Sequence, residues 1–162
     1  MLIGPVANAA PPTQDALMEL ASVPGSTSPS RAIWELVLRA SKAWSSQDPE
    51  GMAACYEESA SLTINRGMPS TGRVELAATA ASYMEAFPDL RVSVDQVLVA
   101  GNSAFWAWTL TGTNTGPGGT GHRVRVSGIE AWTIGDSGLV ANSIGYYDAA
   151  TYERQLAHGI EA

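Results

Sequence analysis

The feature that most constrains this fold is a change in hydrophobic period near Leu90. Before it, apolar residues recur at the spacing of helices; after it, they alternate with polar residues, as in half-buried strands. Because tight-turn sequences such as Gly101-Asn102 separate the alternating segments, we expect consecutive strands to pair antiparallel. Helices followed by a run of strands predict an α+β fold in which the helices cover one face of a curved sheet. The expected strands span residues 91–100, 104–113, 123–134 and 139–148.

The earlier part of the chain contains three helix signals. Ser28-Pro29-Ser30 predicts a helix that runs to about Ser46, and Asp48-Pro49-Glu50 predicts the start of a second one, whose apolar face includes Tyr56. An alanine-rich third helix is expected over residues 73–87. A short strand over Ser61–Asn65, a turn over Gly67–Thr71 and a last helix over Ala149–Ala157 complete the expected order.

The first 29 residues differ in composition from the rest, since they hold five of the nine prolines. We expect residues 1–29 to form a flexible or partly helical extension, with a short helix over Thr13–Ala21. Residues 30–162 are then the folded domain.

Charge and cysteine content exclude several functional classes. Nine basic and 16 acidic residues give a net charge of −7, which argues against nucleic acid or an anionic membrane surface as a partner. One cysteine and two histidines argue against a metal site, and no segment reaches the ~20 apolar residues of a membrane span. The glycine pattern at residues 116–121 matches a dinucleotide fingerprint, but strands flank it on both sides, so we expect a hairpin loop and no cofactor. These features predict a cytoplasmic protein.

Several stretches of the chain carry a resemblance to a known family: AACYEESASLTIN (53–65), TGRVELAATAASYMEAFPDLRVSV (71–94), WTLTGTNTG (108–116) with SGIEAWTI (127–134), and IGYYDAATYERQL (144–156). The chain resembles the SnoaL-like polyketide cyclases of the nuclear transport factor two-like superfamily, to which ketosteroid isomerases and limonene epoxide hydrolases also belong. The resemblance covers about residues 30–157. It implies a cone-shaped domain with a pocket between the helices and the concave face of the sheet, and a homodimer paired through the outer face.

At several positions where these relatives carry reactive groups, this chain has unreactive residues. The base and the oxyanion tyrosine of the isomerases match Ile64 and Ala40, which argues against steroid isomerisation. The charged residues of the epoxide hydrolases match Thr109, Thr111 and Gly145, so that mechanism loses its water-activating acids. Where many SnoaL-like relatives have a histidine, this chain has Asn114.

Glu130 is the leading candidate for a catalytic group. It falls on the strand position at which the isomerases place a hydrogen-bonding acid, so the resemblance implies that it acts as an acid or oxyanion donor. Between Ile129 and Ala131, its carboxyl would be poorly solvated if it points inward, which would raise its pKa. The alternative is a glutamate on the solvated outer face of the sheet.

Three further residues are candidates for assisting Glu130. Alternation along residues 122–132 puts His122 on the same side, where it could act as a base; the alternative is a loop histidine. The family register turns Tyr147 inward as a hydrogen-bond donor or aromatic wall, although a core tyrosine is an equal alternative. Asp148 is a candidate acid, and capping of the last helix explains it without catalysis.

A larger set, mostly aromatic or apolar, is expected to line the pocket and contact the ligand. Such a lining suits a flat, apolar or polycyclic small molecule, although side chains of these types are also common in cores. The set consists of Trp44, Leu62, Ile64, Tyr83, Trp106, Trp108, Thr109, Thr111 and Trp132.

These observations favour two functions. The first is a cofactor-free acid–base enzyme that cyclises, isomerises or opens an epoxide of a polyketide- or terpenoid-like secondary metabolite. The alternative is a non-catalytic small-molecule-binding or accessory protein that has lost the usual reactive residues. A structural dimer with a filled pocket is a third interpretation.

Overall fold

The computed structural model describes residues 29–160 and confirms the α+β architecture. The short helix expected over Thr13–Ala21, like the rest of the chain before Pro29, lies outside the described residues. The elements, in chain order, are α2 (Pro29–Ser45), α3 (Pro49–Ala53), β1 (Tyr56–Ile64), β2 (Ser70–Thr71), α4 (Gly72–Ala86), β3 (Arg91–Ala100), β4 (Ser103–Thr113), β5 (Arg123–Ile134), β6 (Val140–Tyr147) and α5 (Ala149–His158).

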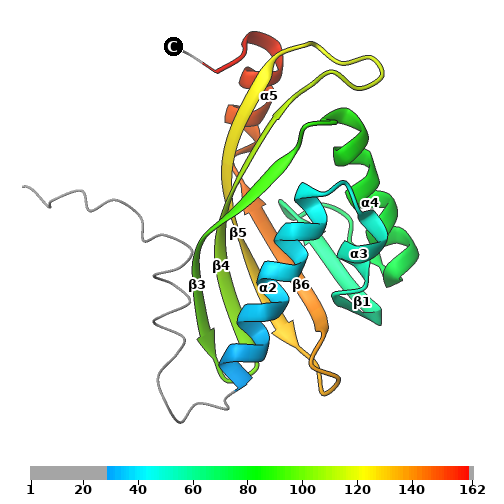
Figure 1. Cartoon of the computed structure of the whole chain (residues 1–162), viewed down its shortest axis with the longest axis vertical. Helices are drawn as coiled ribbons and strands as arrows, with labels where there is room; N and C mark the ends of the chain where they lie inside the picture. Colours follow the sequence, from blue (N-terminus) through cyan, green and yellow to red (C-terminus); the bar gives the residue numbers. More distant parts are fainter. Residues whose placement is uncertain (1–28, 161–162) are drawn as a thin grey trace, which may run out of the picture.

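The strands form one curved sheet in the order β2-β1-β6-β5-β4-β3. The consecutive strands β3 to β6 pair antiparallel, as their turn sequences predict, whereas β1 joins β6 in parallel. Helices α2, α3 and α4 lie against one side of this sheet, and α5 lies at one end of it (Figure 1). The side of the sheet that faces the helices is therefore enclosed.

Helix α2 packs on the sheet through residues at helical spacing, among them Ile33, Val37 and Ala40, which are buried. Near its end, the Ser41 hydroxyl donates to the Val92 carbonyl on β3 at 2.7 Å. The short helix α3 begins as predicted, because the Asp48 side chain accepts from the Gly51 amide at 2.8 Å.

Strand β1 is longer than the sequence predicts, and it begins at Tyr56 instead of Ser61. Tyr56 therefore belongs to the strand and not to the preceding helix. The Val140 amide donates to the Cys55 carbonyl at 3.0 Å, so pairing with β6 starts immediately after α3. The predicted turn over Gly67–Thr71 also ends in a short strand, β2.

The glycine-rich segment at residues 116–121 is a hairpin loop between β4 and β5, as predicted. Asn114 holds it in place: its side-chain amide donates to the Ala86 carbonyl at 3.0 Å and its side-chain oxygen accepts from the Thr120 amide at 2.8 Å. A Cβ at Gly116 would lie 1.9 Å from the Glu85 carbonyl oxygen, so this approach to α4 requires glycine. Of the helices within residues 29–160, none is both long and apolar enough to cross a bilayer.

Candidate active site

A cavity opens between the concave face of the sheet and the helices. Alternation along β4 and β5 turns every second side chain toward it. The space between its walls, together with the open solvent at its mouth, is about 780 Å³. Its lining comprises Ala40, Trp44, Tyr56, Leu62, Ile64, Tyr83, Val92, Trp106, Trp108, Leu110, Val126, Glu130, Trp132, Gly145, Tyr147 and Tyr152.

Glu130 is the one charged residue among those lining residues, and it comes from the middle of β5. The hydroxyl of Ser143, which is fully buried on β6, donates to Glu130 Oε2 at 2.5 Å. Gly145 leaves space for the other oxygen, since a Cβ there would lie 2.4 Å from Glu130 Oε1. Two small residues of β6 thus fit the carboxyl: Ser143 holds it by a hydrogen bond, and Gly145 leaves room for it.

Burial raises the pKa of Glu130 from 4.5 to about 7, although the hydrogen bond from Ser143 opposes the shift. Burial disfavours the charged form because the apolar lining cannot replace the hydration of a carboxylate. Near neutral pH both protonation states are therefore populated. Such a carboxyl can remove a proton from a bound molecule and return it.

Tyr56, at the start of β1, is buried beside Glu130 and Ser143. Burial, and after it the nearby Glu130 carboxyl, raise the pKa of its phenol, whereas the Ser143 hydroxyl and the Trp132 indole beside it lower the pKa. The net shift is upward, so the phenol keeps its proton near neutral pH. It adds a polar but uncharged group to the Glu130 side of the cavity.

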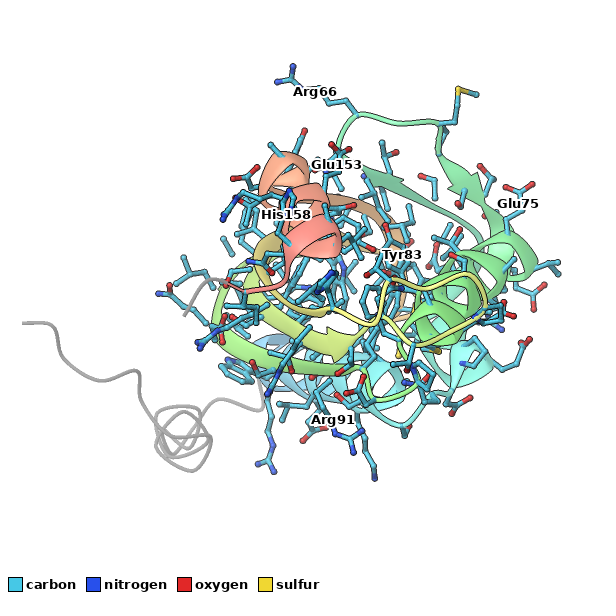
Figure 2. All side chains as sticks on the ribbon, turned by 90° about the horizontal axis from the view of Figure 1, so that it is seen from above. Arg66, Glu75, Tyr83, Arg91, Glu153 and His158 are labelled. Atoms are coloured by element: carbon cyan, nitrogen blue, oxygen red, sulfur yellow. The ribbon has the colours of Figure 1, made fainter. Side chains whose placement is uncertain are left out.

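Aromatic rings pack edge-on against one another around the cavity. The Trp106 and Trp132 rings are 5.3 Å apart, Tyr147 and Tyr152 are 5.6 Å apart, and Trp44 and Tyr83 are 6.1 Å apart. The hydroxyls of Tyr83 and Tyr147 are 3.4 Å apart. Figure 2 shows Tyr83 among the side chains inside the molecule, whereas Arg66 and Arg91 project from its periphery. These contacts give the cavity packed aromatic walls.

Most residues expected to line the pocket do come together around the cavity. Thr109 and Thr111 do not, because they alternate with Trp108 and Leu110 and so lie on the opposite face of the sheet. The Thr109 hydroxyl instead contacts Asp95 at 2.6 Å on that face. The expected residues that line the cavity are Trp44, Leu62, Ile64, Tyr83, Trp106, Trp108, Glu130, Trp132 and Tyr147.

His122 and Asp148 are not among the lining residues. His122 precedes β5 and lies beside the end of α5, where a Cβ at Gly159 would be 3.4 Å from its Nδ1. Asp148 caps α5, accepting from the Thr151 hydroxyl at 2.7 Å and the Thr151 amide at 3.1 Å, and these bonds lower its pKa. The structure thus does not bring either side chain to Glu130.

The pairing of Glu130 with Ser143 is the feature that sequence reasoning missed. In the register of β5 and β6, Glu130 lies opposite Gly145 and Ser143 lies opposite Trp132, so the pair is diagonal. One signal was available: Ser143 is a small polar residue on the inward side of β6, two positions before Gly145. Tyr56 and Tyr152 also line the cavity without having been predicted to do so.

Comparison with known proteins places the chain in a family. Residues 37–143 match the SnoaL-like domain family. No protein of curated function matches the sequence. The chain belongs to the SnoaL-like domain family.

Several solved structures have the same fold. A putative SnoaL-like polyketide cyclase from Jannaschia sp. CCS1 has 22% identity and a TM-score of 0.71 over 80% of this chain and 94% of that one. A protein with a ketosteroid isomerase-like fold from Catenulispora acidiphila, in complex with trimethylamine, has 15% identity and a TM-score of 0.68 over 76% and 92%. TerC, co-crystallised with polyporic acid, has 14% identity and a TM-score of 0.65 over 80% and 99%. At these identities, the similarity shows the fold.

Proposed function

We propose that this SnoaL-like protein is a cofactor-free acid–base enzyme that acts on an apolar secondary metabolite, with Glu130 as the group that transfers the proton. The observation that carries the proposal is a carboxyl with a pKa of about 7 that faces an aromatic-walled cavity. A pKa near the working pH suits a group that must both take up and release a proton.

In the proposed mechanism, the ligand lies against the aromatic walls with a weakly acidic C–H next to Glu130. The carboxylate removes this proton, and the electron pair left on carbon moves into the adjacent unsaturated system. Glu130 then returns the proton to another atom, which completes an isomerisation or permits ring closure. The Tyr83 and Tyr147 hydroxyls, 3.4 Å apart, can hold an oxygen of the ligand through this sequence.

The proposed substrate class is a polyketide- or terpenoid-like molecule of apolar, partly unsaturated character. Support comes from the lining, in which eight aromatic side chains surround one carboxyl. A small organic ligand is consistent with TerC, a protein of the same fold that was co-crystallised with polyporic acid. A cytoplasmic location stays a prediction from the sequence.

The test is proton exchange in a probe ketone. 2-Tetralone is incubated with the full-length protein in D₂O, and loss of the α-hydrogen signals is followed by proton NMR. We expect exchange above the buffer background, with a rate that rises to a plateau through a midpoint near pH 7. Glu130→Gln should return the rate to background, and Glu153→Gln, which changes an exposed glutamate on α5, should leave it unchanged. Exchange that survives in Glu130→Gln would contradict the proposal.

A second candidate function is ligand binding without catalysis. It is favoured by Ala40, Ile64 and Gly145, which line the cavity at positions where related enzymes carry reactive groups. Under this alternative, Glu130→Gln would weaken binding of an apolar ligand only modestly, and the wild-type protein would not exchange 2-tetralone.

We also propose that two copies pair through the outer face of the sheet. This face carries large apolar side chains that are about half exposed, including Leu98, Phe105 and Ile129. Tyr146 extends the patch onto β6. Contiguous exposed apolar surface of this kind commonly marks a protein interface.

A further inference from the structure

The cavity has an unbalanced charge. Among the described residues that line it, Glu130 is the only acid, and no lysine, arginine or histidine is present. The hydrogen bond from Ser143 is neutral and leaves the charge of an ionised Glu130 uncompensated. An anionic ligand would therefore meet a repulsive site, and a cation would supply the missing counter-charge.

The aromatic walls of the cavity also favour a positively charged ligand. Eight aromatic side chains line the cavity: Trp44, Tyr56, Tyr83, Trp106, Trp108, Trp132, Tyr147 and Tyr152. The face of an aromatic ring is electronegative and attracts a cation within about 6 Å, most strongly when the ring is tryptophan and the site excludes water. Three pairs of these rings meet at angles of 68° to 78°, so the two rings of each pair face different directions.

We propose that the ligand carries a tertiary or quaternary ammonium centre with apolar substituents, and that the Glu130 carboxylate and the surrounding aromatic faces bind this cation. The inference rests on the proposed function in one respect, namely that the ligand occupies this cavity with Glu130 facing it. It adds that binding keeps Glu130 ionised, which is the form that removes a proton. The net charge of −7 assists by attracting cations to the protein.

The other titratable groups around Glu130 do not compete for this role. They are tyrosines: Tyr56 from β1, Tyr83 from α4, Tyr147 from β6 and Tyr152 from α5. Burial raises the pKa values of Tyr56, Tyr83 and Tyr152. Glu130 is thus the group whose charge changes in the neutral range.

The test compares two probes of the same shape. Phenyltrimethylammonium carries a permanent charge, and tert-butylbenzene has carbon in place of the charged nitrogen. Binding of each to the full-length protein is followed by tryptophan fluorescence, because Trp44, Trp106, Trp108 and Trp132 line the cavity. At pH 8 we expect the cation to bind at least about tenfold more tightly than its neutral counterpart.

The charge of Glu130 accounts for a defined part of this preference. With a pKa of about 7, its ionised fraction rises about tenfold from pH 6 to pH 8, so affinity for the cation should rise by up to about tenfold. Affinity for tert-butylbenzene should stay constant. Glu130→Gln should remove the pH dependence and most of the preference, and Glu153→Gln should change neither. Binding of tert-butylbenzene to Glu130→Gln shows that the variant pocket is intact.

Equal binding of the two probes at pH 8, binding of neither, or a preference unchanged in Glu130→Gln would overturn the cation site. None of these results bears on proton exchange in 2-tetralone, which tests the enzyme. Conversely, tighter binding of the cation without exchange of 2-tetralone would support the cation site and contradict the proposed enzymatic activity. The two proposals therefore fail separately.

Discussion

The two faces of strands β4 and β5 have the same backbone but opposite surroundings. On the inner face, Trp106 is 4% exposed and Glu130 faces the cavity; one residue away on the outer face, Phe105 is 51% and Ile129 50% exposed. Both faces carry large apolar side chains at these positions, so the presence of an apolar residue alone does not distinguish them there. The difference is that helices enclose one face and leave a concave space there. A carboxyl becomes chemically useful only on that enclosed face, since only there does burial raise its pKa.

The largest expected contrast is in stability. Trp106→Ala should lower the free energy of unfolding by about 3 to 5 kcal/mol, because it removes a buried indole and leaves a cavity. Phe105→Ala, one residue along the strand, should cost the single protomer about 1 kcal/mol or less, because the Phe105 ring is half exposed there. Urea unfolding at low micromolar concentration measures both. Similar losses for the two variants would contradict the assignment of the faces.

The next contrast concerns pH. The pKa of Glu130 in the folded state, about 7, lies above its ordinary value of 4.5, so the folded protein holds this proton more tightly than the unfolded chain does. The contribution of Glu130 to stability is therefore lost as the pH rises from about 4.5 through 7, and ionisation costs up to about 3 kcal/mol at pH 8.

The Glu130→Gln side chain cannot ionise. The free energy of unfolding of this variant should therefore exceed that of the wild type by near zero at pH 4 and by about 3 kcal/mol at pH 8. Unfolding curves at a series of pH values measure this difference. The exposed Glu153→Gln serves as the matched control and should follow the wild type. A difference between Glu130→Gln and the wild type that is independent of pH would show that Glu130 is solvated.

The sequence predicts those differences between the two faces that local interactions determine, and it misses those that depend on residues distant in the chain. Alternation is a local property, so β3, β4 and β5 begin and end close to the predicted residues, and Glu130 shares the inner face with Trp132. The start of β1 depends on its pairing with β6, which is distant in sequence, and the EESA segment at residues 57–60 has no alternation to indicate it. Ser143 could be placed on the inner side of β6 from the sequence, but its contact with Glu130 could not be predicted, because a register shift between Thr133 and Ile134 helps to set which residues meet.

Three candidate site residues show where alternation and family resemblance each fail as predictors. Continuing the alternation of β5 places His122 on the inner face, but the strand begins at Arg123, so the alternation does not apply to His122. The family resemblance places Thr109 and Thr111 in the pocket, whereas alternation with Trp108 indicates the outer face, where both residues lie. Within a strand, alternation predicts the face of a residue better than the family resemblance does. Beyond the end of the strand, neither of them applies.

A smaller effect should follow from removing the partner of Glu130. Ser143→Ala deletes the hydrogen bond that lowers the pKa of Glu130, so the titration midpoint should move upward from about 7. The pH profile of 2-tetralone exchange measures this midpoint. A purely structural role for Ser143 would lower the rate without moving the midpoint, and Ser143→Thr, which keeps the hydroxyl, should restore it.

On the outer face, the corresponding test measures whether two copies of the protein associate. Ile129→Glu places a charge within the exposed apolar patch and should convert the proposed dimer to a monomer, because the carboxylate would have to be desolvated at the interface. Analytical ultracentrifugation of the wild type and variant measures the mass. Binding to the inner cavity should change less than about twofold, since the side chain at position 129 points away from it. A monomeric wild type would contradict the interface.

The smallest expected effect is at the end of β5. His122 lies beside Gly159, and it is not among the cavity-lining residues, so His122→Ala should change phenyltrimethylammonium affinity and 2-tetralone exchange by less than about twofold. The comparison with Glu130→Gln is informative because both residues come from the same stretch of chain and both are titratable. A large loss of exchange in His122→Ala, with its midpoint also moved, would mean that the loop before β5 reaches the ligand, and Glu130 would then share the proton transfer with a second group.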